Sequence, residues 1–234
     1  MQTRSDMNEN IAEQLLRETD DFHGVGPVVD VAGMSSPKVC WFLNRLVAHL
    51  PAGERYLEVG TWQGLTLLSA AYGNLDKVCI GCDKFRLWGR WTGLGWSARR
   101  AFLFNLRRLR RQCGYVHLYE MTDRELFSRG LVQAPIGVYF YDGDHSRAGT
   151  RHGITAAAPL LSRRAVVLVD DWNMPGVREG AHEGLRDAGL SILWQRELSG
   201  DHTRAGWWNG LGVFFVSHGE GPDAQRSPST SRMS

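Results

Sequence analysis

Apolar segments that end close to an acidic residue limit most strongly how this chain can fold. Four of them stand in order along the sequence: 55–59 with Glu58, 77–82 with Asp83, 137–141 with Asp142, and 165–169 with Asp170 and Asp171. Short apolar segments bounded by turns are typical of buried strands in a parallel sheet. In an open α/β sheet, the carboxyl ends of such strands meet at one crevice, where ligands bind. The order therefore predicts one ligand site with several carboxylates around it.

Helical and strand patterns alternate along most of the chain. Apolar spacing predicts helices over 9–19, 39–49, 64–72, 98–112, 123–129, 147–159 and 178–188. Strands are predicted over 55–59, 77–82, 115–119, 137–141, 165–169, 190–197 and 211–216. No helical pattern separates the last two strands, so they should pair as an antiparallel hairpin at one edge. We expect an α/β fold of one Rossmann-like domain with a seven-stranded, mostly parallel sheet.

Composition restricts the class of protein further. The chain has 234 residues, 43% of them hydrophobic, and a formal net charge of +2. That length suits one α/β domain, and that charge does not indicate a protein that binds polyanions. No apolar segment approaches the roughly 20 residues that span a bilayer, and residues 1–10 lack the apolar core of a secretory signal. We therefore expect a cytoplasmic protein.

Cys79 and Cys82 have the CxxC spacing of some zinc and redox sites. However, they fall within a predicted strand, where residues three apart point to opposite faces. We expect two buried thiols instead of a metal or redox pair.

The turn after the first predicted strand has features of a cofactor site. Gly60 and Gly64 allow close backbone approach, and the helix that follows offers free amides at its positive end. Asp83 ends the next strand, where an acidic residue commonly accepts hydrogen bonds from ribose hydroxyls. The third glycine of a pyrophosphate fingerprint is missing, so a nucleoside without pyrophosphate fits better than a dinucleotide. Trp62 lies inside the turn, where we expect it to contact the cofactor or a lid.

The motif Leu57-Glu58-Val59-Gly60-Thr61-Trp62-Gln63-Gly64 resembles the first motif of the class I S-adenosylmethionine-dependent methyltransferases. The resemblance implies three groups of cofactor contacts: Glu58, Gly60, Thr61 and Gly64 around the amino-acid part, Asp83 at the ribose, and Thr122 and Asp123 near the adenine. The segment with Met34 resembles the one that closes over the cofactor in catechol-type O-methyltransferases. These implications divide the chain into N-terminal helices with a lid (1–52), a methyltransferase domain (53–218) and a disordered tail (219–234).

Carboxylates at neighbouring strand ends predict a metal site. Adjacent strands lie about 4.8 Å apart, so Asp142, Asp170 and Asp171 can meet at one point, and oxygen ligands of this kind suit Mg²⁺. The structural alternative is that Asp170 caps a turn and Asp171 is solvated. Asp142-Gly143-Asp144 and Asp170-Asp171 resemble the metal motifs of the magnesium-dependent macrocin- and novobiocin-type sugar O-methyltransferases. That resemblance implies that Asp142, beside the cofactor, binds metal with Asp170 and Asp171, and that Asp144 is the catalytic base.

His145 competes with Asp144 for the role of base, because its unperturbed pKa of about 6.5 suits proton transfer near neutral pH. The expected activity is magnesium-dependent O-methylation of a small polyhydroxylated or glycosylated metabolite, as in natural-product tailoring. The alternatives are N-methylation of an amino sugar, an RNA-binding methyltransferase, and a non-catalytic protein that keeps the pocket.

Two further patterns concern partners. Six arginines crowd the helix predicted at 98–112 and its end: Arg99, Arg100, Arg107, Arg108, Arg110 and Arg111. Such a pattern is more typical of a solvated helix face than of an RNA site, so we expect neither nucleic-acid nor membrane partners. Five tryptophans fall in predicted loops: Trp88, Trp91, Trp96, Trp207 and Trp208. They can line a substrate pocket or form a homo-oligomer interface.

Overall fold

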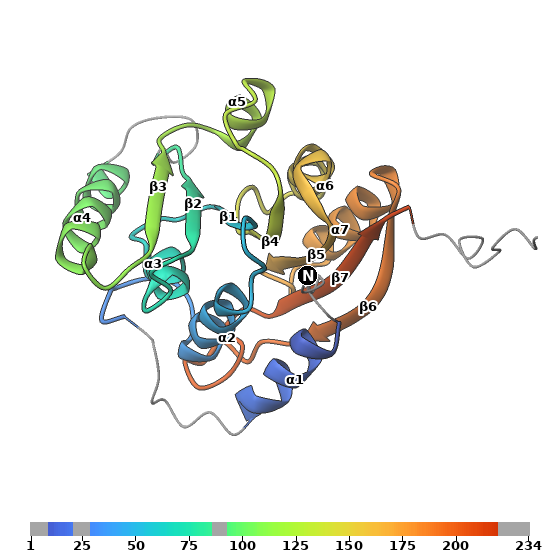
Figure 1. Cartoon of the computed structure of the whole chain (residues 1–234), viewed down its shortest axis with the longest axis horizontal. Helices are drawn as coiled ribbons and strands as arrows, with labels where there is room; N and C mark the ends of the chain where they lie inside the picture. The colour runs from blue at the N-terminus through green and yellow to red at the C-terminus, as the bar shows by residue number, and fades with distance from the viewer. Residues whose placement is uncertain (1–8, 21–28, 86–92, 220–234) are drawn as a thin grey trace, which may run out of the picture.

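The computed structural model describes residues 9–20, 29–85 and 93–219. Its centre is one seven-stranded sheet in the order β3-β2-β1-β4-β5-β7-β6 (Figure 1). The strands are β1 Arg55–Val59, β2 Val78–Cys82, β3 Tyr115–Tyr119, β4 Ile136–Tyr141, β5 Leu161–Asp170, β6 Leu190–Leu198 and β7 Leu211–His218. The first five pair in parallel, whereas β7 is antiparallel to both β5 and β6. The predicted fold class is therefore confirmed, including the antiparallel hairpin of β6 and β7, in which β6 is the edge strand.

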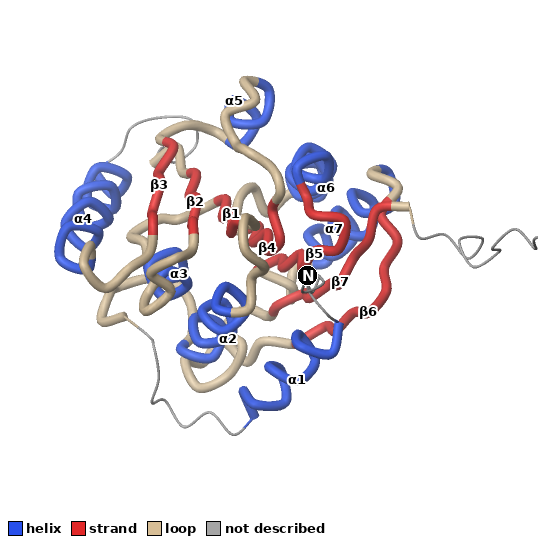
Figure 2. Tube along the Cα trace, viewed as in Figure 1, coloured by secondary structure: helices blue, strands red, loops and turns tan. Residues whose placement is uncertain are grey.

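Helices cover both faces of the sheet (Figure 2). They are α1 Glu9–Asp20, α2 Pro37–Ala48, α3 Leu65–Ala71, α4 Gly93–Leu109, α5 Asp123–Ser128, α6 Arg147–Ala157 and α7 Pro175–Asp187, with the short 3-10 helix η1 Ala158–Leu160. One buried apolar cluster packs the helices α1, α2, α3 and α4 against one face of the sheet. A second cluster packs the helices α5, α6 and α7 against the other face. This doubly wound arrangement leaves the carboxyl ends of the parallel strands open for a site.

Alternation along the strands assigns each side chain to a face. Cys79 belongs to the first cluster and Cys82 to the second, three residues later in β2. Both thiols are buried and free. The expectation that they point to opposite faces is confirmed.

Several helix ends differ from the predicted ones. The helix predicted from residue 98 begins at Gly93 in α4, because Gly95 and Ala98 lie on its buried face, where small residues allow close packing. The helix predicted from residue 178 begins at Pro175, a residue that the first turn of a helix accepts. In α2, Pro37 occupies the first turn and the Ser36 hydroxyl accepts a hydrogen bond from the amide of Val39. Trp88, Trp91 and the tail from residue 220 lie outside the described residues.

Candidate active site

A cavity of about 270 Å³ opens at the carboxyl ends of β1, β2 and β4. Its lining comes mainly from the loops that follow these strands and β3: Met34, Val59, Gly60, Trp62, Cys82, Asp83, Lys84, Phe85, Met121, Thr122, Asp123, Asp142, Gly143, Asp144 and His145. Nine of these were predicted as site residues, namely Met34, Gly60, Trp62, Asp83, Thr122, Asp123, Asp142, Asp144 and His145. The remaining six mostly adjoin a predicted residue in the sequence, so proximity to a strand end was the signal that could have found them.

The turn between β1 and α3 depends on glycine. Gly60 has a φ of +91°, and a Cβ there would lie 1.8 Å from the carbonyl oxygen of Asp142. The Gly60 amide donates to the carbonyl of Cys82 at 2.8 Å. The missing side chain therefore lets the end of β1 lie directly against the end of β4. Trp62 follows with a φ of +45°, and this places it at the cavity.

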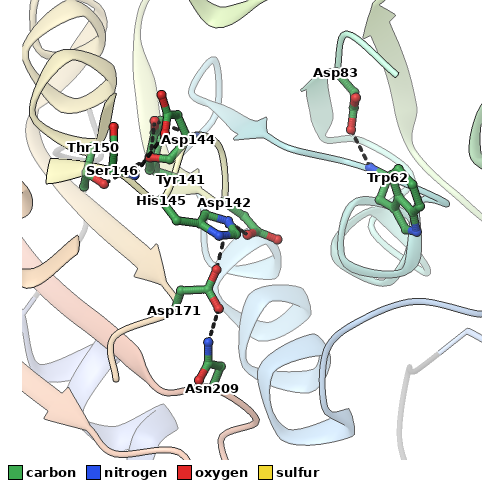
Figure 3. Close-up of polar contacts among 10 residues, drawn as sticks. All are labelled: Trp62, Asp83, Tyr141, Asp142, Asp144, His145, Ser146, Thr150, Asp171 and Asn209. Atoms are coloured by element: carbon green, nitrogen blue, oxygen red, sulfur yellow. Dashed lines mark hydrogen bonds and ion pairs between the residues drawn. The ribbon is translucent and has the colours of Figure 1, made fainter. Parts of the chain in front are cut away.

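Asp83 is held by the backbone on both sides. Its Oδ2 accepts a hydrogen bond from the amide of Trp62 at 2.7 Å, and its Oδ1 accepts one from the amide of Phe85 at 2.6 Å. Burial raises the pKa of Asp83 despite these hydrogen bonds. The contact with Trp62 fixes the carboxylate across the cavity from the cluster around His145 (Figure 3). A carboxylate held in this way can accept hydrogen bonds from a diol through its remaining lone pairs.

Glu58, Thr61 and Gly64 do not line the cavity, although the motif resemblance placed them at the cofactor. Glu58 is fully buried and accepts hydrogen bonds from the Tyr56 hydroxyl at 2.6 Å and the Thr66 hydroxyl at 2.7 Å. Burial raises its pKa to about 8. Because it alternates with the cavity-lining Val59, Glu58 points to the sheet face covered by α3. It supports the turn from within the core.

The far end of the cavity is formed where β3 leads into α5. Thr122 caps this helix, since its hydroxyl accepts from the amide of Glu125 while the Glu125 carboxylate accepts from the Thr122 amide. The Cys82 thiol donates to the carbonyl of Met121 at 3.3 Å. These contacts hold Met121, Thr122 and Asp123 in place beside Asp83.

Three of the predicted site residues meet in one cluster at the rim of this cavity. The His145 Nε2 lies 2.8 Å from Asp171 Oδ2 and 3.4 Å from Asp142 Oδ1. Asp171 has a φ of +55°, and its Oδ1 accepts a hydrogen bond from the side-chain amide of Asn209 (Figure 3). Sequence reasoning missed Asn209, which lies in the β6–β7 loop without a motif around it.

The charges in this cluster influence one another. Hydrogen bonds to Asp142 and Asp171 raise the pKa of His145 to about 10. Burial raises the pKa of Asp142. Burial also acts to raise the pKa of Asp171, but hydrogen bonds from His145 and Asn209 outweigh it, so that this pKa is lowered. The arrangement therefore combines a negatively charged carboxylate with a cationic imidazole.

The donor atoms of Asp142, His145 and Asp171 all lie within 4.8 Å of one another, a spacing that fits one divalent cation. Asp170 is not in this group. It is 4% exposed, and its Oδ1 has no hydrogen-bond partner among the described residues. Burial and the nearby charges of Asp142 and Asp171 raise its pKa. An orphaned buried carboxylate beside the donor group is consistent with a cation or a proton at this place.

Asp144 is occupied by the turn into α6. Its Oδ1 accepts from the amide of Ser146 at 2.9 Å, and its carbonyl accepts from the hydroxyls of Tyr141 and Thr150, each at 3.3 Å. Figure 3 shows this set of contacts apart from those of His145 with Asp142 and Asp171. Asp144 touches the cavity, but the structure gives its carboxylate a local role.

The arginine pattern of α4 lies mainly on its outer side. Gly95, Ala98, Phe102, Asn105 and Leu109 form the buried side, while Arg100, Arg107 and Arg108 are exposed. Arg99 pairs with Glu120.

Trp207, one of the tryptophans predicted in loops, packs edge-on against Phe42 with ring centroids 6.3 Å apart. None of the helices within residues 9–20, 29–85 and 93–219 has the length and apolar character that a membrane crossing requires.

The chain is similar to known methyltransferases both in sequence and in fold. Residues 57–172 match the model of a family described as a methyltransferase domain. No curated protein sequence matches the chain. Among solved structures, the cofactor-bound Rv0187 from MTB is 19% identical with a TM-score of 0.58, over 89% of this chain and 90% of that one. The SAH complex of an O-methyltransferase from Bacillus cereus is 15% identical with a TM-score of 0.55, over 90% and 92%.

The SAM complex of the O-methyltransferase TomG from Streptomyces achromogenes, involved in tomaymycin synthesis, is 19% identical with a TM-score of 0.55, over 91% and 92% of the two chains. These likenesses agree with the seven-stranded sheet and its antiparallel hairpin. The family match spans the strands that build the cavity, so residues 57–172 form a methyltransferase domain, and the chain has the fold of S-adenosylmethionine-dependent methyltransferases.

Proposed function

We propose that this methyltransferase transfers the methyl group of S-adenosylmethionine to a hydroxyl of a small polyhydroxylated or glycosylated metabolite. The observation that carries this proposal is the contact of His145 with Asp171 and Asp142 at the rim of the cofactor-sized cavity. A hydroxyl must lose a proton as its oxygen attacks the methyl carbon, and this cluster supplies groups that bind and move protons. The O-methyltransferase TomG supports the assignment to natural-product tailoring.

The cofactor would lie along the cavity from α5 to the cluster. Asp83 would accept the ribose hydroxyls, with Thr122 and Asp123 at the adenine end. Gly60 and Trp62 would border the methionine part, and Met34 is placed to cover it, since it lines the cavity although 62% of it is exposed. This orientation would bring the reactive methyl group toward Asp142 and His145.

Asp142 and Asp171 would hold a magnesium ion, with the buried Asp170 carboxylate close behind and His145 Nε2 left free to accept a proton. Bound in this way, the ion would bind the acceptor oxygen and lower the pKa of its hydroxyl. The hydrogen bonds to these carboxylates, aided by their negative charge, are what raises the pKa of His145. Neutralising that charge would bring the imidazole back toward the range where it can accept a proton.

His145 is the base that the geometry favours. It is 45% exposed in its side chain and contacts both carboxylates, whereas the Asp144 carboxylate is bonded to the turn before α6. His145 Nε2 would take the hydroxyl proton while the oxygen–methyl bond forms and the sulfur–methyl bond breaks. The products would be the methyl ether and S-adenosylhomocysteine.

A methyl-transfer assay with labelled S-adenosylmethionine and magnesium tests this function. The acceptor panel should contain sugars, glycosides, catechols, amino sugars and RNA. We expect label in hydroxylated acceptors, a loss of at least about 100-fold in His145→Asn, and a smaller loss in Asp144→Asn. Label in amino sugars or RNA alone would contradict O-methylation, and equal losses in the two variants would contradict the choice of base.

A further inference from the structure

Asn209 is the one described side chain that donates a hydrogen bond to the far oxygen of Asp171. We propose that Asn209 is a positioning residue for the reaction, which holds the Asp171 carboxylate so that its other oxygen faces His145. This inference rests on the proposed role of His145 as the base. It adds a group from the β6–β7 loop to a site built mainly from the loops after β1 to β5.

The chemistry of the contact is directional. A carboxylate is an acceptor at both oxygens, so the amide nitrogen of Asn209 must be the atom that faces Asp171. Asp171 Oδ2 lies 2.8 Å from His145 Nε2, and Oδ1 receives the Asn209 amide. With both oxygens occupied, turning the plane of the carboxylate would weaken both contacts. Asn209 thus holds the carboxylate in the orientation in which it meets His145.

The position of Asn209 is itself fixed by the backbone. Its carbonyl accepts from the amide of Asn173 at 2.9 Å, which ties the loop to the turn that follows Asp171. The Trp172 amide donates to the carbonyl of Gly210 at 3.3 Å. Gly210 has a φ of +89°, and a Cβ there would lie 2.8 Å from Asn173 Oδ1, so the two turns can approach this closely only with glycine.

The same loop is anchored in the body of the protein. Trp207 packs edge-on against Phe42 of α2, and the Asn173 side chain exchanges two hydrogen bonds with Gly200, at 2.9 and 3.0 Å. Trp208, next to Asn209, has a φ of +56°, which is costly for a bulky residue. A loop held by these contacts presents a rigid donor to Asp171.

Three variants separate positioning from loop stability. Asn209→Ala removes the donor, and Asn209→Asp keeps the shape but places a second acceptor against Asp171. Thr203→Ala is the matched control, because it removes hydrogen bonds within the same loop, to Asp201 and Gly206, without touching Asp171. Groups that orient catalytic ligands typically change activity by about 10- to 100-fold when they are removed.

Steady-state kinetics with the best acceptor form the first readout. We expect kcat to fall by about 10- to 100-fold in Asn209→Ala with KM within about threefold, and further in Asn209→Asp. Thr203→Ala should keep kcat within about twofold of wild type. A purely structural role predicts that kcat falls only because less protein is folded, which a denaturation curve of each variant would show. Equal kcat values in Asn209→Ala and Thr203→Ala would overturn the proposal.

The second readout does not need turnover. In protein labelled with ¹⁵N-histidine, the ring signals of His145, assigned by their loss in His145→Asn, should shift in both Asn209 variants and stay unchanged in Thr203→Ala. Unchanged signals in the Asn209 variants would overturn the positioning role. If wild type methylated no hydroxylated acceptor, the proposed function would fail, while this shift would still decide whether Asn209 orients the cluster.

Discussion

Glu58 is a fully buried carboxylic acid with two hydroxyl partners and no cation beside it among the described residues. Its pKa rises from an ordinary 4.5 to about 8 because burial disfavours the charged form. The folded state therefore holds a proton on Glu58 that the unfolded state loses. The stabilisation from that proton is complete below pH 4.5 and is lost as the pH rises to about 8.

Glu58→Gln should remove this dependence. We expect the unfolding free energy of wild type to fall more steeply with pH than that of the variant, by about 1.4 kcal/mol per pH unit within this window. Urea denaturation of both proteins between about pH 5 and pH 8 measures the difference between their unfolding free energies. Because the other titrating groups are the same in both proteins, their contributions cancel in this difference. Parallel curves would show that Glu58 is ionised in the folded protein.

A substitution of Asp83 tests whether this end of the cavity binds the cofactor. Asp83→Ala should weaken the affinity for S-adenosylhomocysteine by about 1–3 kcal/mol, because the ribose hydroxyls lose their acceptor. Calorimetry measures this loss. Asp76→Ala is the control, since Asp76 is an exposed carboxylate that precedes β2 at the opposite end of the strand. An affinity equal to that of wild type would remove Asp83 from the cofactor site.

At the scale of the element, the turn between β1 and α3 depends on close approach as well as on φ. Gly60 and Gly53 have almost the same φ, +91° and +89°. A Cβ at Gly53 meets nothing within 4 Å, whereas one at Gly60 collides with the backbone of Asp142. Gly53→Ala should cost about 1–2 kcal/mol from backbone strain alone.

Gly60→Ala should cost at least about 1–3 kcal/mol more, because β1 and β4 must separate. Denaturant unfolding of the two variants measures the difference, and cofactor affinity should fall in Gly60→Ala only. Equal losses of stability would mean that the turn can move away from Asp142 without penalty.

The elements also show what sequence reasoning can and cannot reach. The strands and the antiparallel pairing of the last two follow from apolar segments and from the connections between them. Asp83, Asp142 and His145 reach the cavity because they follow strand ends. Glu58 resembles a cofactor contact in its motif, yet strand alternation turns it into the core. Asn209 lies in a loop without periodicity, so only the tertiary contact of β7 with β5 brings it to Asp171.

The start of α4 illustrates a different difficulty. Gly93, Gly95 and Trp96 have the composition of a loop, and local propensity therefore predicted a helix that begins later. Tertiary packing decides the matter, since Gly95 and Ala98 are buried on the face of α4 that packs against the protein. The effect of such packing cannot be read from a local window of sequence.

At the scale of the whole molecule, the cavity and the acidic cluster form one continuous site across β1, β2, β4 and β5. Asp142 and His145 belong to both, because they line the cavity and contact each other in the cluster with Asp171. Cofactor and metal would thus bind side by side, at the edge of the sheet where parallel strands end. Asn209, in the loop of the β6–β7 hairpin, joins the site at this edge through its hydrogen bond to Asp171.

Isothermal titration of S-adenosylhomocysteine into the whole protein, with and without magnesium, tests the account most directly. We expect binding of one molecule in both conditions, and heat from magnesium added to that complex which is lost in Asp171→Ala. Binding of S-adenosylhomocysteine without any response to magnesium would contradict the metal role of Asp142 and Asp171. No binding in either condition would contradict the assignment of the cavity to the cofactor.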